Sequence, residues 1–299
     1  MARSEGEGRG MKPLNTKLPT LFKDPFTFVA ILWLAIVALT ALFLPLLPLE
    51  LSHETDSTVA LQSPSQEHWF GTDALGRDLF SRILRGTRVS IACGIAGALT
   101  ALILGVGYGL ISGGGSDRRD HWLMRFVDLV DSIPLVFLVI LLASVLRGSA
   151  LEASGGGLGV FFVILGAVYW TPMARIVRGE TRVLRHREWA LAATALGVPQ
   201  KRILWREVLP NLMPTIIVTV TLIVPRVLLF EAFLSFLGLG VQSPAVSWGT
   251  LARDAFEVLN PVQTAWWLIL YPSVTLALTL LALNLLGDQL RKILDPKQR

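Results

Sequence analysis

Two charged residues, Arg226 and Glu231, interrupt the apolar run of residues 213–237. A helix that starts near Met213 places Arg226 about 20 Å along its axis, just past the middle of a lipid bilayer. A charge at that depth is costly unless it faces an aqueous pathway or a partner. The two residues therefore predict either a substrate pathway or a buried contact between helices. They do not pair within one helix, because five residues turn Glu231 about 140° away from Arg226.

The remaining reactive residue types do not form a catalytic pattern. Four His and one Cys, Cys93, supply no metal-ligand cluster, and Cys93 lies in an apolar run without a disulfide partner. No G-x-x-x-x-G-K-[ST] segment occurs, so the usual phosphate-binding loop for ATP is missing from the sequence. No nucleophile and base are arranged together either. We predict a protein that is not an enzyme and that holds no metal or cofactor of its own.

Composition indicates an all-α integral membrane protein. The 299 residues are 53% hydrophobic and only 16% charged, with a mean hydropathy of +0.58, which is typical of a chain that crosses the bilayer repeatedly. The net charge of +5 does not indicate a nucleic-acid partner, because the basic residues lie in loops between apolar runs. Six runs are long enough to cross the bilayer: 26–47, 89–111, 123–146, 158–177, 213–237 and 265–286.

The distribution of positive charge predicts the orientation of these six spans. If both termini are cytoplasmic, 20 of the 27 Lys and Arg residues lie in cytoplasmic segments and six lie outside, with Arg226 alone inside a span. This asymmetry follows the positive-inside rule. The predicted divisions are a cytoplasmic tail (1–25), a first span (26–47), an outer loop (48–88), a core of five spans (89–287) and a second cytoplasmic tail (288–299).

A polar, basic stretch at residues 188–211 separates the fourth and fifth spans. Its first half is rich in alanine and favours a short helix, which Gly197 ends. A second short helix is predicted from Pro199 to Leu209, where Pro210 excludes the helical conformation from the preceding residue. Two short helices that meet at a glycine form a compact knob on the cytoplasmic side. The alternative is an ordinary helical hairpin without a docking function.

The outer loop carries a second polar segment, from Trp69 to Arg88. Thr72 or Asp73 is predicted to cap a helix, and Asp78 is spaced for an i,i+4 ion pair with Arg82. An amphipathic helix at the outer interface would account for this pattern by itself.

Two smaller patterns concern the second and third spans. Gly105, Gly107 and Gly109 predict close helix packing. Asp128 lies three residues from Arg125, which predicts a local ion pair near the cytoplasmic end of the third span.

The 188–211 stretch resembles the EAA loop of bacterial ABC importer permeases, whose coupling helix docks into a groove on the ATP-hydrolysing subunit. Leu191 stands where that family has an acidic residue, Glu188 three residues earlier is placed to take over part of its role, and Val208 replaces an isoleucine. The residues that match the loop pattern are Ala192, Ala193, Gly197, Leu209 and Pro210.

The outer segment resembles the GTDxxGRD stretch of C-type permeases in the dipeptide, oligopeptide and nickel importer group. The matching residues are Gly71, Thr72, Asp73, Gly76, Arg77 and Asp78. Further matches at 224–240, 247–251 and 287–297 are similar to the C-type oligopeptide permease, so that the matching segments cover most of residues 69–299.

This resemblance implies a type I ABC importer permease with six transmembrane helices in the plasma (inner) membrane. Its implied partners are a second homologous permease subunit, two ABC ATPase subunits that hold ATP and Mg²⁺, and an extracytoplasmic peptide-binding protein. The implied cargo is oligopeptides, with dipeptide or nickel transport as alternatives in the same family. An ion-gradient-driven secondary transporter is the alternative from another class, although six spans without an internal repeat fit it poorly. A channel subunit is a third alternative.

Overall fold

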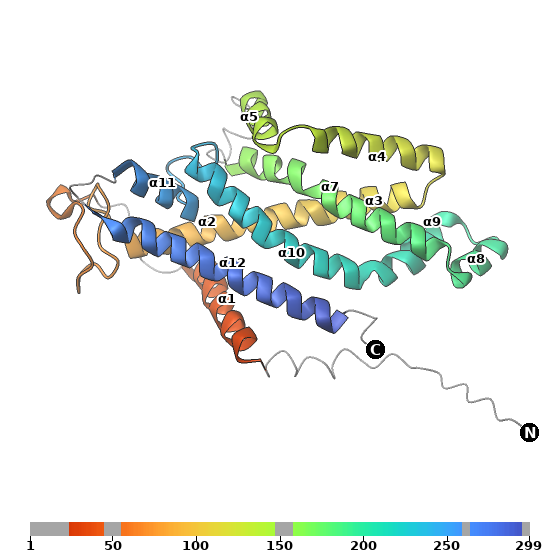
Figure 1. Cartoon of the computed structure of the whole chain (residues 1–299), viewed down its shortest axis with the longest axis horizontal. Coiled ribbons are helices and arrows are strands. Elements are labelled where there is room, and N and C mark those ends of the chain that lie inside the picture. The colour runs from red at the N-terminus through yellow and green to blue at the C-terminus, as the bar shows by residue number, and fades with distance from the viewer. Residues whose placement is uncertain (1–23, 45–54, 147–157, 259–263, 295–299) are drawn as a thin grey trace, which may run out of the picture.

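The computed structural model describes residues 24–44, 55–146, 158–258 and 264–294, and this part of the chain is helical with no strand. Most helices run along one long axis, as Figure 1 shows. The α-helices are α1 (Pro25–Phe43), α2 (Leu79–Thr100), α3 (Val106–Gly113), α4 (Asp117–Ser132), α5 (Leu135–Leu146), α7 (Leu158–Arg185), α8 (Glu188–Ala195), α9 (Gln200–Ile203), α10 (Leu209–Phe236), α11 (Trp248–Val258) and α12 (Trp266–Leu294).

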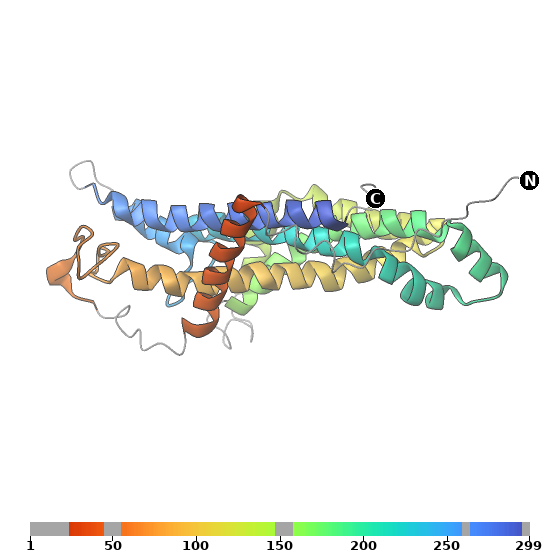
Figure 2. The same ribbon diagram turned by 90° about the horizontal axis from the view of Figure 1, so that it is seen from below.

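The helix α1 crosses the bundle at a steep angle, which is clearest in Figure 2. Asp24 caps it by accepting hydrogen bonds from the backbone N–H of Thr27 at 3.3 Å and from its hydroxyl at 2.6 Å. Trp33 donates its indole N–H to the Thr279 hydroxyl of α12 at 3.0 Å. The first span is therefore attached to the last one. The rest of the predicted N-terminal tail lies outside the described residues.

The second span is longer than the predicted 89–111, because α2 begins at Leu79 and continues through a π-helical turn at Ala101–Gly105 into α3. Glycines on this run allow α7 to approach closely. A Cβ at Gly105 or Gly109 would lie 2.7 Å from a backbone carbonyl oxygen of α7. The prediction of close packing is confirmed for these two glycines. It is not borne out for Gly107, because no described residue beyond its own stretch of helix lies within 4 Å of the Cβ position there.

The predicted third span, 123–146, is not one straight helix. It consists of α4 and α5, which meet at an angle of 92°. Ile133 adopts an extended conformation with ψ of 126°, because Pro134 disfavours the helical conformation in the residue before it. By length and composition, the described residues hold five spans, or six if this bent pair counts as one.

The long helices α7 and α10 pass through prolines, although a proline often ends or kinks a helix. Pro172 lies inside α7, which extends to Arg185 rather than to residue 177. The short helix predicted to end at Leu209 instead continues from α9 through a π-helical turn at Leu204–Val208 into α10. This turn lies directly before Pro210, where the wider backbone spacing removes the clash that a proline ring makes in a regular α-helix. The last span also continues past residue 286, to Leu294.

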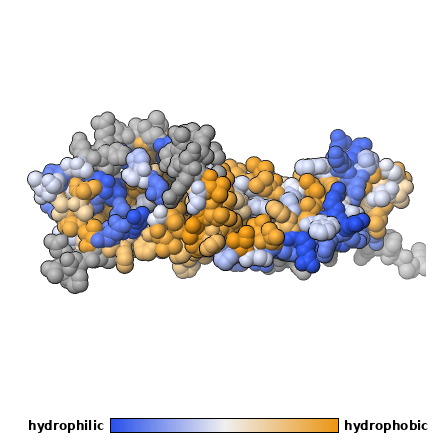
Figure 3. Space-filling model, turned by 90° about the horizontal axis from the view of Figure 1, so that it is seen from above, coloured by the Kyte–Doolittle hydropathy of each residue, from blue (hydrophilic) through white to orange (hydrophobic). Residues whose placement is uncertain are grey.

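One face of the molecule separates into three zones along the long axis. Figure 3 shows hydrophobic residues across the middle of one face and hydrophilic residues towards both ends. The hairpin of α8 and α9 projects beyond the bundle at one end, and the loop before α2 lies at the other end (Figure 1). This arrangement is expected of a chain whose middle is covered by lipid.

Candidate coupling and translocation sites

The hairpin that follows α7 consists of α8, the turn at Gly197, and α9. Gly197 has φ of +79°, and the N–H groups of Gly197 and Val198 donate to the carbonyls of Thr194 and Ala193 at 3.0 and 3.1 Å. This pattern is the Schellman motif, which needs a left-handed residue and favours glycine. The predicted helix stop at Gly197 is therefore confirmed.

The two alanines that match the coupling-loop pattern face different ways. Ala193 is half-buried and packs with Val198 against the main hydrophobic core. Ala192 is exposed, as is Leu191 beside it. Ala193 points inward because of its position in the Schellman motif. Two residues mark the open surface instead: Leu191 and Leu196, which are 53% and 85% exposed.

The other predicted residues of this stretch frame the hairpin. Glu188 is exposed in the first turn of α8, where a carboxylate is favourable beside the helix N-terminus. Leu209 is half-buried, Pro210 is exposed, and both belong to the start of α10. The hairpin is therefore continuous with two long helices, since α7 ends shortly before α8 begins and α9 leads into α10.

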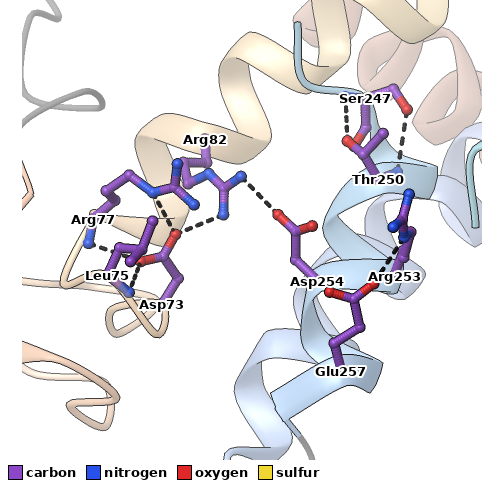
Figure 4. Close-up of polar contacts among 9 residues, drawn as sticks. All are labelled: Asp73, Leu75, Arg77, Arg82, Ser247, Thr250, Arg253, Asp254 and Glu257. Carbon is purple, nitrogen blue, oxygen red and sulfur yellow. Dashed lines mark hydrogen bonds and ion pairs between the residues drawn. The ribbon is translucent and has the colours of Figure 1, made fainter. Parts of the chain in front are cut away.

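The outer segment folds into a tight loop in front of α2, organised by Asp73. Its carboxylate accepts hydrogen bonds from the backbone N–H groups of Leu75 and Arg77 at 2.8 and 2.9 Å. The same carboxylate pairs with the side chains of Arg77 at 2.7 Å and Arg82 at 2.6 Å (Figure 4). Asp73 and Arg82 are each only 5% exposed. This buried ion pair and the additional hydrogen bonds tie the loop to the first turn of α2.

Arg82 extends this cluster to another part of the chain. Its guanidinium also binds Asp254 of α11 at 2.9 Å (Figure 4), which joins the outer loop to the segment between the last two spans. The predicted pair of Asp78 and Arg82 is wrong. Asp78 instead caps α2 by accepting from the backbone N–H of Ser81 at 2.8 Å. The prediction that Thr72 or Asp73 caps the helix is wrong for the same reason.

The glycines of this segment are needed for their conformation. Gly71 and Gly76 have φ of +77° and +73°, in the left-handed region that favours glycine. A Cβ at Gly76 would lie 1.8 Å from the carbonyl oxygen of Asp56. Thr72 is fully buried and accepts from the backbone N–H of Gln62 at 2.8 Å. Residues 69–78 of the segment thus form an ordered loop, and residues 79–88 form the first turns of α2, which continues into the bundle.

Glu231 lies inside the bundle, with none of its surface exposed. Its carboxyl oxygens accept hydrogen bonds from the hydroxyls of Ser90 on α2 at 3.1 Å and Ser235 at 2.7 Å. These hydroxyls accept in turn from the backbone N–H groups of Trp248 and Val241, each at 3.2 Å. Glu231 therefore joins α10 to α2 and to the segment that leads into α11. It makes a contact between helices and does not face a pathway.

Arg226 has the opposite environment, because its side chain is exposed. No carboxylate pairs with it in the described part of the chain. The Tyr169 hydroxyl of α7 donates to the Arg226 backbone carbonyl at 3.1 Å. The two charged residues of the fifth span therefore have different roles.

A row of arginines along α7 was missed by the sequence analysis. Arg175, Arg178, Arg182 and Arg185 recur every three or four residues and therefore share one face of the helix. Arg175 binds Asp131 at 2.7 Å and Asp128 at 2.9 Å, so the predicted local pair of Asp128 with Arg125 is replaced by a contact between helices.

Asp120 of α4 binds the two central arginines of this row, and it is 3% exposed. It accepts from Arg178 at 2.9 Å, from Arg182 at 2.5 Å and from the Ser112 hydroxyl at 2.6 Å. The matching spacing of acidic residues on α4 and arginines on α7 was the signal in the sequence. Recognising it required knowing that the two helices are neighbours.

A family model described as "Binding-protein-dependent transport system inner membrane component" matches residues 105–299. The chain belongs to this family, whose members are permease subunits of ABC importers. The resemblance seen in the sequence is therefore confirmed, and the chain is a multi-pass inner-membrane protein.

Several curated proteins are similar over most of this length. The oligopeptide transport system permease protein OppC of Bacillus subtilis is 39% identical over 276 residues, which cover 92% of this chain and 87% of that protein. OppC of Escherichia coli K12 is 39% identical over 268 residues, which cover 89% of this chain and 85% of that protein. The dipeptide transport system permease protein DppC of B. subtilis is 41% identical over 236 residues, covering 79% and 71%.

A solved structure shares the fold. A chain of the MetNI methionine ABC transporter, in a structure titled as inward facing, superposes with a TM-score of 0.56. The match covers 70% of this chain and 95% of that chain at 16% sequence identity. At that identity the similarity supports the ABC permease architecture alone.

Proposed function

We propose that this chain forms half of the translocation pathway of an ATP-driven importer for oligopeptides. A second, related permease subunit would form the other half. Two separate ATPase subunits would hold ATP and Mg²⁺ and carry out hydrolysis, and an extracytoplasmic binding protein would deliver the peptide. Both termini of the chain would be cytoplasmic. The observation that carries this proposal is the hairpin of α8 and α9, which projects from the end of the bundle with apolar side chains exposed.

Exposed apolar side chains on this hairpin indicate a protein partner. Leu196 is 85% exposed at the tip, and Trp205 on the turn after α9 is 58% exposed. The segment between α7 and α10 is the polar, basic stretch of the sequence, and it projects beyond the end of the bundle in Figure 2. Lipid tails would not cover these side chains there, whereas a groove on an ATPase subunit would.

Continuity of the helices supplies a way to transmit movement. The α8 helix follows α7 after two residues, and α9 leads into α10 without a break in the helical backbone. When ATP binding closes the two ATPase subunits, a docked hairpin would move, and both long helices would move with it. The spans would then exchange an inward-open arrangement for an outward-open one, as a shift between two populated states.

Peptides are the cargo that the relatives favour. The similar B. subtilis and E. coli OppC proteins are named as oligopeptide permeases. Dipeptides are the second candidate, which the 41% identity to B. subtilis DppC supports. These names favour peptides over the nickel alternative, and the family favours a binding-protein-dependent system over a gradient-driven transporter.

The docking role of the hairpin is tested by placing a charge at its tip. Leu196→Glu should leave the permease inserted in the membrane but remove most of the ATPase subunits that copurify with it, together with peptide uptake. The matched control is Leu75→Glu, which changes a leucine that is 51% exposed on the outer loop. Copurified ATPase per permease is measured for both variants in mild detergent. Equal ATPase retention in Leu196→Glu and wild type would show that the hairpin does not dock.

A further inference from the structure

Arg226 places a permanent positive charge deep inside the transmembrane part of α10. It lies ten residues before the end of the helix at Phe236 and 17 residues after its start at Leu209, which corresponds to about 15 and 25 Å along the axis. Its neighbours Pro225 and Val227 are buried, whereas its own side chain is exposed. Arg226 therefore points away from the core of this subunit.

The described part of the chain does not neutralise this charge. Glu231 is the nearest acidic residue along α10, but it lies about 140° around the helix and already accepts the hydroxyls of Ser90 and Ser235. Three arginines of α7 bind aspartates: Arg175, Arg178 and Arg182. Arg226 differs from all of these, since no carboxylate approaches its guanidinium among the described residues.

The backbone beside Arg226 is fixed by aromatic residues. The Tyr169 hydroxyl binds the Arg226 carbonyl at 3.1 Å, and the Tyr169 ring packs edge-on against Phe230 with centroids 5.9 Å apart. This contact holds α7 and α10 together at the level of the charge. The guanidinium therefore extends from a stretch of backbone that α7 holds in place, as a binding group requires for a defined position.

A guanidinium in the middle of the bilayer is too costly to face lipid tails. The exposed face at Arg226 therefore borders an aqueous pathway or a partner subunit. A pathway for peptides has to pass a carboxylate through the middle of the membrane, because every unmodified linear peptide ends in one whatever its side chains. A fixed cation there lowers the cost of moving that carboxylate out of bulk water.

We propose that Arg226 binds the C-terminal carboxylate of the peptide as it passes along the pathway. This inference rests on the proposed function. It goes further by naming the chemical group of the peptide that the permease recognises, which is the C-terminal carboxylate. Arginine suits the role because its planar fork binds a carboxylate with two parallel hydrogen bonds. A solvent-exposed pair is weak enough to release the peptide, whereas a dry, fully buried pair would trap it.

The experiment compares a peptide that ends in a free carboxylate with the same peptide ending in an amide. Uptake is measured in vesicles that contain the full importer and its binding protein, with wild-type, Arg226→Gln and Arg226→Lys permeases. The uptake rate of each variant is divided by the wild-type rate for the same peptide. Any preference of the binding protein for one peptide then cancels, because it affects both rates equally. The charge-matched control is Arg253→Gln, which removes an exposed cation of α11 that pairs only with Glu257 at 2.9 Å among the described residues.

We expect Arg226→Gln to lower uptake of the free-acid peptide about tenfold, the fold-change that corresponds to losing about 1.4 kcal/mol of charge-assisted binding. Uptake of the amide should stay near the wild-type rate. Arg226→Lys should restore part of the free-acid uptake, because it keeps the charge and loses the fork. Arg253→Gln should not change the ratio between the two peptides.

Three results would overturn the proposal. An equal fall for both peptides, or no fall for either, would show that Arg226 does not recognise the carboxylate. Loss of the assembled complex in Arg226→Gln, restored in Arg226→Lys without a preference between the peptides, would assign Arg226 to an ion pair with the partner subunit. Failure of the wild-type importer to take up either peptide would instead refute the proposed function, and this inference with it.

Discussion

The buried carboxyl group of Glu231 gives the sharpest test of how this bundle is held together. Glu231→Ala removes the acceptor of two hydroxyl donors, Ser90 and Ser235, neither of which reaches water. Each hydrogen bond to a carboxyl group contributes about 1.5 kcal/mol or more, so the loss should be about 3 kcal/mol. The space left by the side chain adds a cavity term to this value.

The assay is thermal unfolding of the purified importer complex in detergent. A loss of about 3 kcal/mol corresponds to a fall in Tm of about 5 °C for a chain of 299 residues, at an unfolding entropy of about 2.1 cal/mol/K per residue. The matched control is Glu257→Ala, because Glu257 makes an exposed i,i+4 pair with Arg253, and such pairs contribute about 0–1 kcal/mol. A Tm for Glu231→Ala within about 1 °C of the control would refute the assignment of Glu231 as the link between α2, α10 and α11.

Further predictions concern the hairpin, the orientation and the contact between α4 and α7. Gly197→Ala should lower the free energy of unfolding by about 1–2 kcal/mol and weaken ATPase retention, because φ is +79°. The loss would come from the backbone conformation alone, since no atom crowds the Cβ position. Gly179→Ala, where the space is equally open within a helix, should be neutral or stabilising, and equal effects would contradict this reasoning. A cysteine at Ser57 should react with an impermeant thiol reagent from outside and one at Gln200 should not; outside labelling at Gln200 would exclude a cytoplasmic hairpin. Asp120→Ala should lower stability by about 2 kcal/mol or more, because two arginines lose a shared acceptor, and an unchanged Tm would show that this contact contributes nothing.

Much of the architecture could be predicted, because the thickness of the bilayer sets the length of a span and its apolar residues are visible in the sequence. Six apolar runs, each near the length that crosses the hydrocarbon core, correspond to the spans of the structure, with α4 and α5 as one bent span. The stop at Gly197 was also predictable, since a left-handed turn at a helix end is a local steric requirement. The positive-inside asymmetry is likewise readable from residue order alone.

Helix bounds were harder to predict, because local breakers act differently within a packed helix. Pro172 and Pro210 do not end helices here, and a π-helical turn precedes Pro210. Pro134 does end one, where Ile133 takes an extended conformation. A single sequence does not show which proline is accommodated, because that depends on the helices packed around it.

The partners of the charged residues were decided only by the tertiary structure. Arg82 reaches Asp254, 172 positions away, and Glu231 reaches Ser90, 141 positions away. Sequence spacing offered Asp78 as the partner of Arg82, at a distance that suits a helix, but Asp78 caps that helix instead. Local spacing identifies the partners that a helix makes available, whereas a buried charge takes the partner that the packing of distant helices places beside it.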